Sequence, residues 1–292
     1  MNYLLFIIVF FIVLFFYIHI YYQLNTNDDL EIYEINEPTK DKLEEICDLK
    51  QPIMFKYLND NLMTNCNLIN LGENYNVFDI NIRNNENNEL FVPLQLKDSI
   101  ELFNNDNKSK YISENNEDFL KETTLIKYFK VNDEFLRPPL VSKCIYDFMT
   151  GSKNSHTPLR YDLNYRNYYL VTQGEIKVIL IPPKYSKYLY LEKDYLNFEF
   201  YSQVNCWEPQ DKYKNDFNKL KKLELTLKEG DLLFIPSYWW YSIRFNEISS
   251  VCCFKYRTYI NTLSILPQLC IYMLQNMNVK HNLVKIKDKI EY

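Results

Sequence analysis

The feature that most constrains this chain is an apolar run at its N-terminus. Residues 3–22 read YLLFIIVFFIVLFFYIHIYY and include no charged side chain. As a helix rising about 1.5 Å per residue, such a run spans about 30 Å, the thickness of a bilayer's hydrocarbon core. A cleavable signal peptide would need a basic start, yet the first Lys or Arg of the chain is Lys40. A buried core helix is rarely apolar on every side over this length. We therefore expect residues 1–22 to form an uncleaved, single-pass membrane anchor, with residues 3–22 inside the membrane.

Charge and composition limit the partners of the chain. Neither flank of the apolar run carries Lys or Arg, so the sequence does not predict the side of the membrane on which the rest lies. Scarce Gly and abundant Asn, Tyr and Phe are typical of a low-GC genome, such as that of a protist or a large DNA virus. For a virus, the membrane would belong to the virion or the host. The net charge of −5 argues against a nucleic-acid partner. A protein partner is not indicated.

The remainder of the chain is expected to form one domain after a short linker. Residues 23–37 are polar and acidic, which predicts the linker, and residues 38–292 form the domain. Within it we distinguish an N-terminal part (38–139), a core (140–256) and C-terminal helices (257–292). Two Asn-rich stretches, 84–89 and 104–118, are predicted to be exposed loops. The core contains many short β-branched and aromatic segments separated by turn residues, which predicts a mainly β fold with flanking helices.

The cysteines do not indicate a metal or redox motif. The seven cysteines are scattered and include no C-x-x-C pair. We expect reduced, mostly buried thiols, including the adjacent Cys252 and Cys253.

Two segments of the core resemble a known family. The first reads TPLRYD at 157–162 and continues through Asn167 and Gly174 to LIPP at 180–183; the second is LKEGDLLFIPSYWWYSI at 227–243. Together they resemble the cupin-like branch of the JmjC-type 2-oxoglutarate oxygenases, whose pattern includes T-P-L-H-x-D and G-D-x-L-F-I-P-x-x-W-W-H. The resemblance covers about residues 140–256. It implies a double-stranded β-helix, a jelly-roll barrel of two antiparallel sheets, behind the N-terminal transmembrane helix.

The departures from the family pattern bear on activity. Active members hold Fe(II) with two histidines and one carboxylate. The first histidine position is Arg160 and the second is Tyr241, so only the carboxylate, Asp162, is kept. The family's lysine for the co-substrate falls on Ile176, and the neighbouring Lys177 should face away from the interior. A guanidinium stays protonated and has no lone pair for a metal. The resemblance therefore implies a degenerate iron site, without metal or cofactor.

The other histidines are poor substitutes as ligands. Six residues of extended chain separate His156 from Asp162, or about 20 Å at about 3.3 Å each, so co-ligation would need a sharp bend. His281 lies in the polar tail, where we expect it to face solvent.

Three interpretations of the degenerate site stay open. Arg160 and Asp162 lie at i and i+2 of one strand, so we expect them to pair, with Tyr241 bonded to either. In the first interpretation this pocket holds only satisfied polar groups. In the second, Arg160 binds a small anionic ligand, assisted by Thr157 or Asn167. In the third, the chain is an active 2-oxoglutarate-dependent hydroxylase with an atypical metal site. We favour a membrane-anchored pseudo-oxygenase that acts as a binding or structural module.

Overall fold

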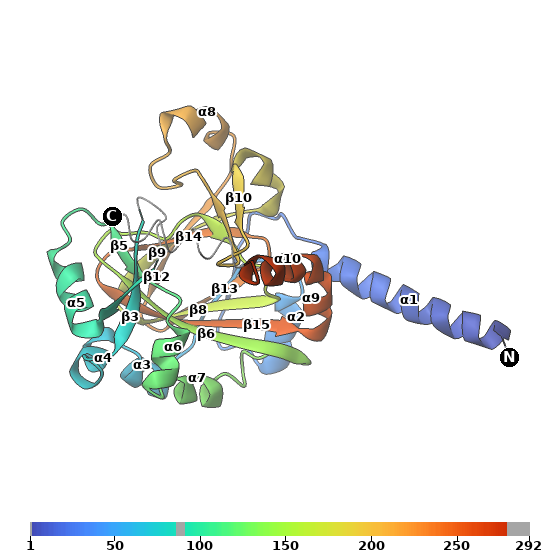
Figure 1. Cartoon of the computed structure of the whole chain (residues 1–292), viewed down its shortest axis with the longest axis horizontal. Coiled ribbons are helices and arrows are strands. Elements are labelled where there is room, and N and C mark those ends of the chain that lie inside the picture. The colour runs from blue at the N-terminus through green and yellow to red at the C-terminus, as the bar shows by residue number, and fades with distance from the viewer. Residues whose placement is uncertain (1, 86–90, 279–292) are drawn as a thin grey trace.

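The N-terminal apolar run forms a helix that projects from a mainly β body (Figure 1). The structure is a computed structural model that describes residues 2–85 and 91–278. Helix α1 (Asn2–Leu24) contains the apolar stretch Tyr3–Leu24, within which an 18-residue segment has a mean hydropathy of 2.8 and is not buried by the rest of the chain. Length and composition suit a membrane span, as they also suit a signal sequence.

Two sheets make up the body. The larger has the order β1-β2-β13-β8-β15-β6-β5-β3-β4 and the smaller the order β10-β11-β7-β14-β9-β12. Neighbouring strands are antiparallel except for the parallel pair β1–β2. The strands of the larger sheet are, in that order, Tyr33–Ile35, Ile53–Lys56, Asp231–Pro236, Arg166–Gln173, Ser249–Thr258, Val141–Gly151, Tyr111–Ser113, Asp79–Asn84 and Val92–Gln95. Those of the smaller sheet are Leu191–Asp194, Glu199–Ser202, Arg160–Tyr161, Trp240–Phe245, Glu175–Ile181 and Leu223–Lys228.

The two sheets face each other across a shared apolar interior. Because alternate residues of a strand point to opposite faces, Val251 and Cys253 of β15 enter this interior. Cys252 and Phe254 point the other way, into the core beneath the helices. The same alternation separates Trp239, which lies between the sheets, from Trp240, which packs on the outer face of the smaller sheet. Both tryptophans are buried, and so are both cysteines, as predicted for Cys252 and Cys253.

Helices cover the outer faces of the sheets. Figure 1 shows α3–α7 along one side of the body and α8 on the opposite side. Helices α2 (Lys40–Cys47), α3 (Asp60–Asn65), α4 (Leu68–Asn74), α5 (Leu96–Asn105), α6 (Glu117–Glu122) and α7 (Ile126–Asn132) contribute to the core over the larger sheet. The smaller sheet is covered by the excursion that contains η1 (Pro183–Tyr188), η2 (Asp211–Tyr213) and α8 (Lys214–Phe217). Helices α9 (Tyr259–Ser264) and α10 (Leu266–Asn276) follow β15. The mainly β architecture with flanking helices, predicted from the sequence, is confirmed.

Two segments expected to be irregular are structured. Residues 33–35, within the expected linker 23–37, form strand β1 because β2 offers a parallel edge to pair with. Within the expected loop 104–118, residues 111–113 form β5, and Glu114 and Asn116 are each only 1% exposed. Polar groups can be buried there because they are hydrogen-bonded: Asp147 accepts the backbone N–H groups of Asn115 and Asn116 at 2.9 and 2.6 Å.

Some sequence predictions fall partly outside the described residues. These are most of the loop at 84–89, the end of the C-terminal region 257–292, and His281.

Candidate functional site

The structure brings Arg160, Asp162 and Tyr241 together between the two sheets. Arg160 on β7 is the direct partner of Tyr241 on β14, and Asp162 follows the end of β7. The Arg160 Nε donates to the Tyr241 hydroxyl at 3.2 Å, and that hydroxyl donates to Asp162 Oδ2 at 2.9 Å. The phenol at the second histidine position therefore links the other two ligand positions.

The carboxylate that pairs with Arg160 is Glu114. Arg160 Nη2 donates to Glu114 Oε2 at 2.5 Å, and the side chains of both residues are almost fully buried. The expected ion pair between Arg160 and Asp162 is wrong, because each charge has a different partner. Glu114 directly follows β5 and enters the interior from the larger sheet, where it meets the guanidinium.

A second arginine shares Glu114. Arg83 on β3 lies 3.0 Å from Glu114 Oε1 and 3.1 Å from Glu199 Oε2 on β11. Burial alone would raise the pKa of Glu114, but the positive charges of Arg160 and Arg83 outweigh it, and the pKa is lowered. Glu114 is thus an ionised carboxylate held between two guanidinium groups.

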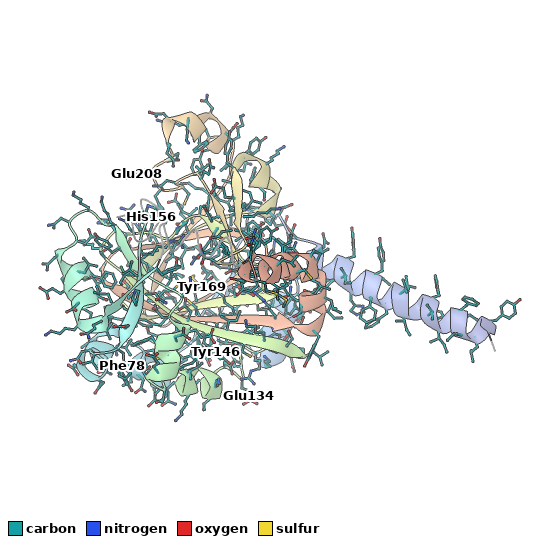
Figure 2. The ribbon with its side chains drawn as sticks, in the orientation of Figure 1. Phe78, Glu134, Tyr146, His156, Tyr169 and Glu208 are labelled. Atoms are coloured by element: carbon teal, nitrogen blue, oxygen red, sulfur yellow. The ribbon has the colours of Figure 1, made fainter. Side chains whose placement is uncertain are left out.

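Asp162 pairs with Lys255. The ammonium of Lys255, which lies on β15 beyond the inward-facing Val251 and Cys253, is 2.9 Å from Asp162 Oδ2. Burial would raise the pKa of Asp162, but Lys255 and then Arg160 lower it. The Tyr169 hydroxyl, from β8, lies 2.8 Å from that of Tyr241 and 3.2 Å from Asp162; Tyr169 is labelled within the body in Figure 2. The side chains of Asp162 and Lys255 are 20% and 18% exposed, so this pair is the more open side of the site.

Charges balance across the whole cluster. Its three cations are Arg83, Arg160 and Lys255. Its three carboxylates, each within an ion pair, are Glu114, Asp162 and Glu199. Buried charges are tolerated when they are paired, and each charge of this cluster has an opposite charge as its partner, while Arg83 Nε is buried without a hydrogen-bond partner.

The residues at this site do not fit Fe(II). Asp162 is the one carboxylate kept at the ligand positions, and its Oδ2 already meets Lys255 and Tyr241. Burial raises the pKa of Tyr241 to about 12, which keeps its phenol protonated. Over residues 2–85 and 91–278, no three His, Cys, Asp or Glu side chains gather in a way that could hold a metal ion. The donor set that ferrous iron requires is therefore missing from this position.

The position that the family resemblance assigns to the co-substrate lysine carries an apolar side chain. Ile176 on β9 is fully buried in the interior between the sheets, while Lys177 is exposed on the other face. The strand therefore presents an apolar side chain where the family's lysine would lie.

Two predicted site residues serve the backbone. The Thr157 hydroxyl accepts the N–H of Ile243 at 2.9 Å, which joins the segment before β7 to β14. The Asn167 amide donates to the Ile235 carbonyl at 3.1 Å, and its oxygen accepts from Asn164 at 3.2 Å. Their bonds hold neighbouring segments in place and do not extend to Arg160.

Sequence reasoning missed Glu114, Lys255 and Tyr169. Lys255 carried a usable signal, because it is a single cation within the strand segment VCCFKY and shares the inward parity of Val251 and Cys253. Glu114 carried none, because it lies 46 residues before Arg160 in an Asn-rich stretch.

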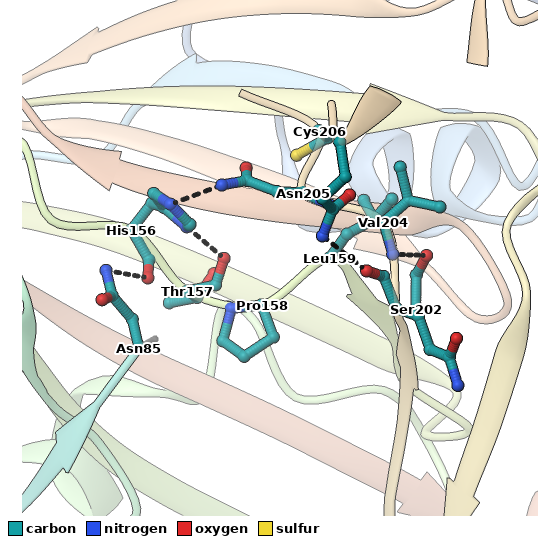
Figure 3. A pocket seen from close by; sticks show the side chains of 11 residues that line it. Asn85, His156, Thr157, Pro158, Leu159, Ser202, Val204, Asn205 and Cys206 are labelled. Atoms are coloured by element: carbon teal, nitrogen blue, oxygen red, sulfur yellow. Dashed lines mark hydrogen bonds between the residues drawn. The ribbon is translucent and has the colours of Figure 1, made fainter. Parts of the chain in front are cut away.

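A separate cavity lies beside His156, on the segment before β7 (Figure 3). Its volume is about 300 Å³. The His156 ring nitrogens lie 3.2 Å from the Thr157 carbonyl and 3.4 Å from the Asn205 amide, and burial lowers the pKa of this imidazole. Asn85 donates to the His156 carbonyl at 3.4 Å. The polar groups here are bonded to one another, and His156 is directed at Thr157 and Asn205.

Comparisons with known proteins agree with this architecture. The family model described as "Cupin-like domain" matches residues 28–261, beginning within the segment expected to be a linker. The curated relatives include "HSPB1-associated protein 1" from Bos taurus, Rattus norvegicus and Homo sapiens, each 31% identical over 94 residues. That stretch is 32% of this chain and 19%, 20% and 19% of the respective relatives. The chain thus covers about a fifth of the length of the relatives it matches.

Proposed function

From the premise that this chain belongs to the cupin-like domain family, we propose that it is a membrane-anchored pseudo-oxygenase that acts as a binding or structural module. The supporting observation is the ion pair between Arg160, at the first histidine position, and Glu114. The position that would hold a metal ligand is thereby part of a buried, charge-balanced network.

Electrostatics gives the size of the effect. A dication about 4 Å from a guanidinium would meet a repulsion of about 8 kcal/mol at an effective dielectric constant of about 20. Asp162 is the one carboxylate that could offset this repulsion, and it already forms an ion pair with Lys255. Ile176 adds a second obstacle, because it gives the acidic co-substrate no cation.

Two observations support a binding module at a membrane. The α1 helix is long and apolar enough to place the domain at a membrane. The relatives are named for association with another protein, which favours a role in protein binding over catalysis. The barrel would then present its surface, with a rigid polar network at its centre.

A small anionic ligand at Arg160 stays a prediction, and Glu114 would compete with it for the guanidinium. Such a ligand would have to displace Glu114 from the guanidinium or bind at the more open Asp162–Lys255 side. A thermal-shift titration with succinate or phosphate tests this. Binding at Arg160 predicts a rise in Tm that the Arg160→Ala protein does not show.

The decisive experiment measures iron and turnover together. The full chain, purified in detergent, is incubated anaerobically with Fe(II) and 2-oxoglutarate, then exposed to air. We expect iron well below one equivalent and no succinate above background. Asp162→Ala is the matched control: without an iron site, it should retain as little iron as the wild type. Stoichiometric iron that this substitution removes, together with succinate release, would instead support an active hydroxylase with an atypical metal site.

A further inference from the structure

The C-terminal end of α1 is fixed to the body. The Tyr22 hydroxyl donates to the Asp48 carbonyl at 3.1 Å, at the end of α2. The Lys50 ammonium donates to the backbone carbonyls of Tyr22 and Asn25, the latter at 2.7 Å, and lies 4.1 Å from the centre of the Tyr22 ring. A lysine on the last carbonyls of a helix is a favourable C-terminal cap. The helix therefore ends on the domain.

The chain after α1 is held as well. At the end of α1 itself, Gln23 is buried, and the helix packs against α9. Two hydrogen bonds hold the residues that follow. The Asn27 amide donates to the Leu49 carbonyl at 2.9 Å, and Asp28 accepts the N–H of Lys184 at 2.7 Å. These bonds leave little freedom between the helix and the body.

Exposed apolar side chains lie on α9 and on the segments beside it, next to the end of α1. We name these residues the apolar collar, and each is between 41% and 77% exposed: Leu49, Leu140, Tyr259, Leu263 and Leu266. They come from the turn after α2, the residue before β6, α9 and the start of α10. The backbone N–H of Tyr259 donates to the Leu140 carbonyl at 3.2 Å, which joins two parts of the collar. Figure 1 shows α2 and α9 at the end of the body from which α1 projects.

The collar also lacks charge where α9 and α10 contribute to it. From Thr258 to Asn278 the sequence includes no Asp, Glu, Lys or Arg. A contiguous exposed apolar surface marks an interaction site, and a tyrosine beside it is typical of the boundary between water and lipid.

We propose that the apolar collar rests in the headgroup–acyl boundary of the bilayer that α1 crosses, and so holds the domain in one orientation on the membrane. This inference rests on the membrane anchor proposed above. The bilayer is the occupant that fits because α1, itself exposed and apolar, enters the body beside the collar. A membrane around α1 therefore continues onto the collar. The domain would sit directly on the lipid surface.

The test places a fluorophore on the collar and another far from it. In full-length protein carrying Cys270→Ser, which removes the exposed cysteine, Leu140→Cys is labelled with nitrobenzoxadiazole. Ile69→Cys on α4 is the matched control, because Ile69 is 63% exposed and α4 lies at the side of the body away from α1 (Figure 1). Each protein is placed in phosphatidylcholine nanodiscs containing lipid with a spin label on its headgroup.

We expect the label at position 140 to be quenched several-fold more strongly than that at position 69. Equal, weak quenching at both positions would overturn the collar proposal. A parallel flotation of phosphatidylcholine liposomes at alkaline pH reports on α1. Protein that floats with the lipid but shows equal, weak quenching refutes the collar alone, whereas protein that does not float refutes the anchor and the collar with it.

Discussion

Replacing Arg160 with alanine tests the buried network at its centre. The substitution removes a charged hydrogen bond to Glu114, worth about 1.5–3 kcal/mol, and a second bond to Tyr241, worth about 1 kcal/mol. Removing one partner of a buried ion pair costs about 3–5 kcal/mol when the other charge is left alone. Glu114 keeps Arg83 at 3.0 Å, so the lower part of that range applies. We expect the free energy of unfolding to fall by about 3 kcal/mol.

The effect should depend on pH in a defined direction. In the folded protein the pKa of Glu114 is lowered, with the guanidinium groups outweighing burial. A carboxyl with a depressed folded pKa contributes stability above its unfolded pKa, about 4.3, and loses that contribution as pH falls through the folded pKa. The difference in unfolding free energy between the wild type and Arg160→Ala should therefore be largest at neutral pH and should shrink in acid.

Denaturant titration of the full chain in detergent provides the measurement. The buried Trp239 and Trp240 make tryptophan fluorescence a reporter of unfolding. Lys177→Ala on the exposed face of β9 is the control and should change stability by less than about 0.5 kcal/mol. A loss at Arg160→Ala no larger than that of the control, or one that does not shrink as pH is lowered from 7 to well below 4, would refute the network.

Three further variants, two single and one double, probe the same cluster. Tyr241→Phe removes the hydroxyl between Arg160 and Asp162 and should lower the unfolding free energy by about 1–2 kcal/mol in the same titration; an unchanged midpoint would contradict the bridge. Lys255→Met leaves Asp162 without its nearest cation and should destabilise by about 1–2 kcal/mol, because solvent partly screens this pair. Since Lys255 lowers the pKa of Asp162, this loss should shrink as pH falls below about 4, and a loss that grows in acid would argue against the pair. Arg160→His combined with Tyr241→His should bind iron weakly at most, as measured by elemental analysis. It should release no succinate in a product assay, because Ile176 is unchanged. Succinate production would show that Ile176 is not an obstacle.

The fold could be predicted because its signals are local. Alternation along strands such as β15, together with turns at Gly174 and Gly230, reports which face of each strand is buried. Both glycines have φ near +80°, a backbone conformation that suits glycine at a turn. The same alternation explains why Trp239 lies between the sheets and Trp240 lies on the outer face of the smaller sheet.

The partners at the site could not be predicted in the same way. The position of Arg160 follows from a motif, but the carboxylate that neutralises it comes from the residue after β5, a strand of the opposite sheet. An i, i+2 spacing allows Arg160 and Asp162 to meet, yet it does not rank Asp162 against competitors such as Glu114. Composition misled at the same point, because Asn116 in this Asn-rich stretch is buried, with its backbone N–H bonded to Asp147.

The most direct test of the central claim is an anomalous-scattering map at the iron edge, from crystals grown or soaked anaerobically with Fe(II) and 2-oxoglutarate. We predict no anomalous peak among Arg160, Asp162 and Tyr241, with continuous contact between the Arg160 guanidinium and Glu114. An iron peak within bonding distance of Asp162, with Arg160 turned away from Glu114, would contradict the account.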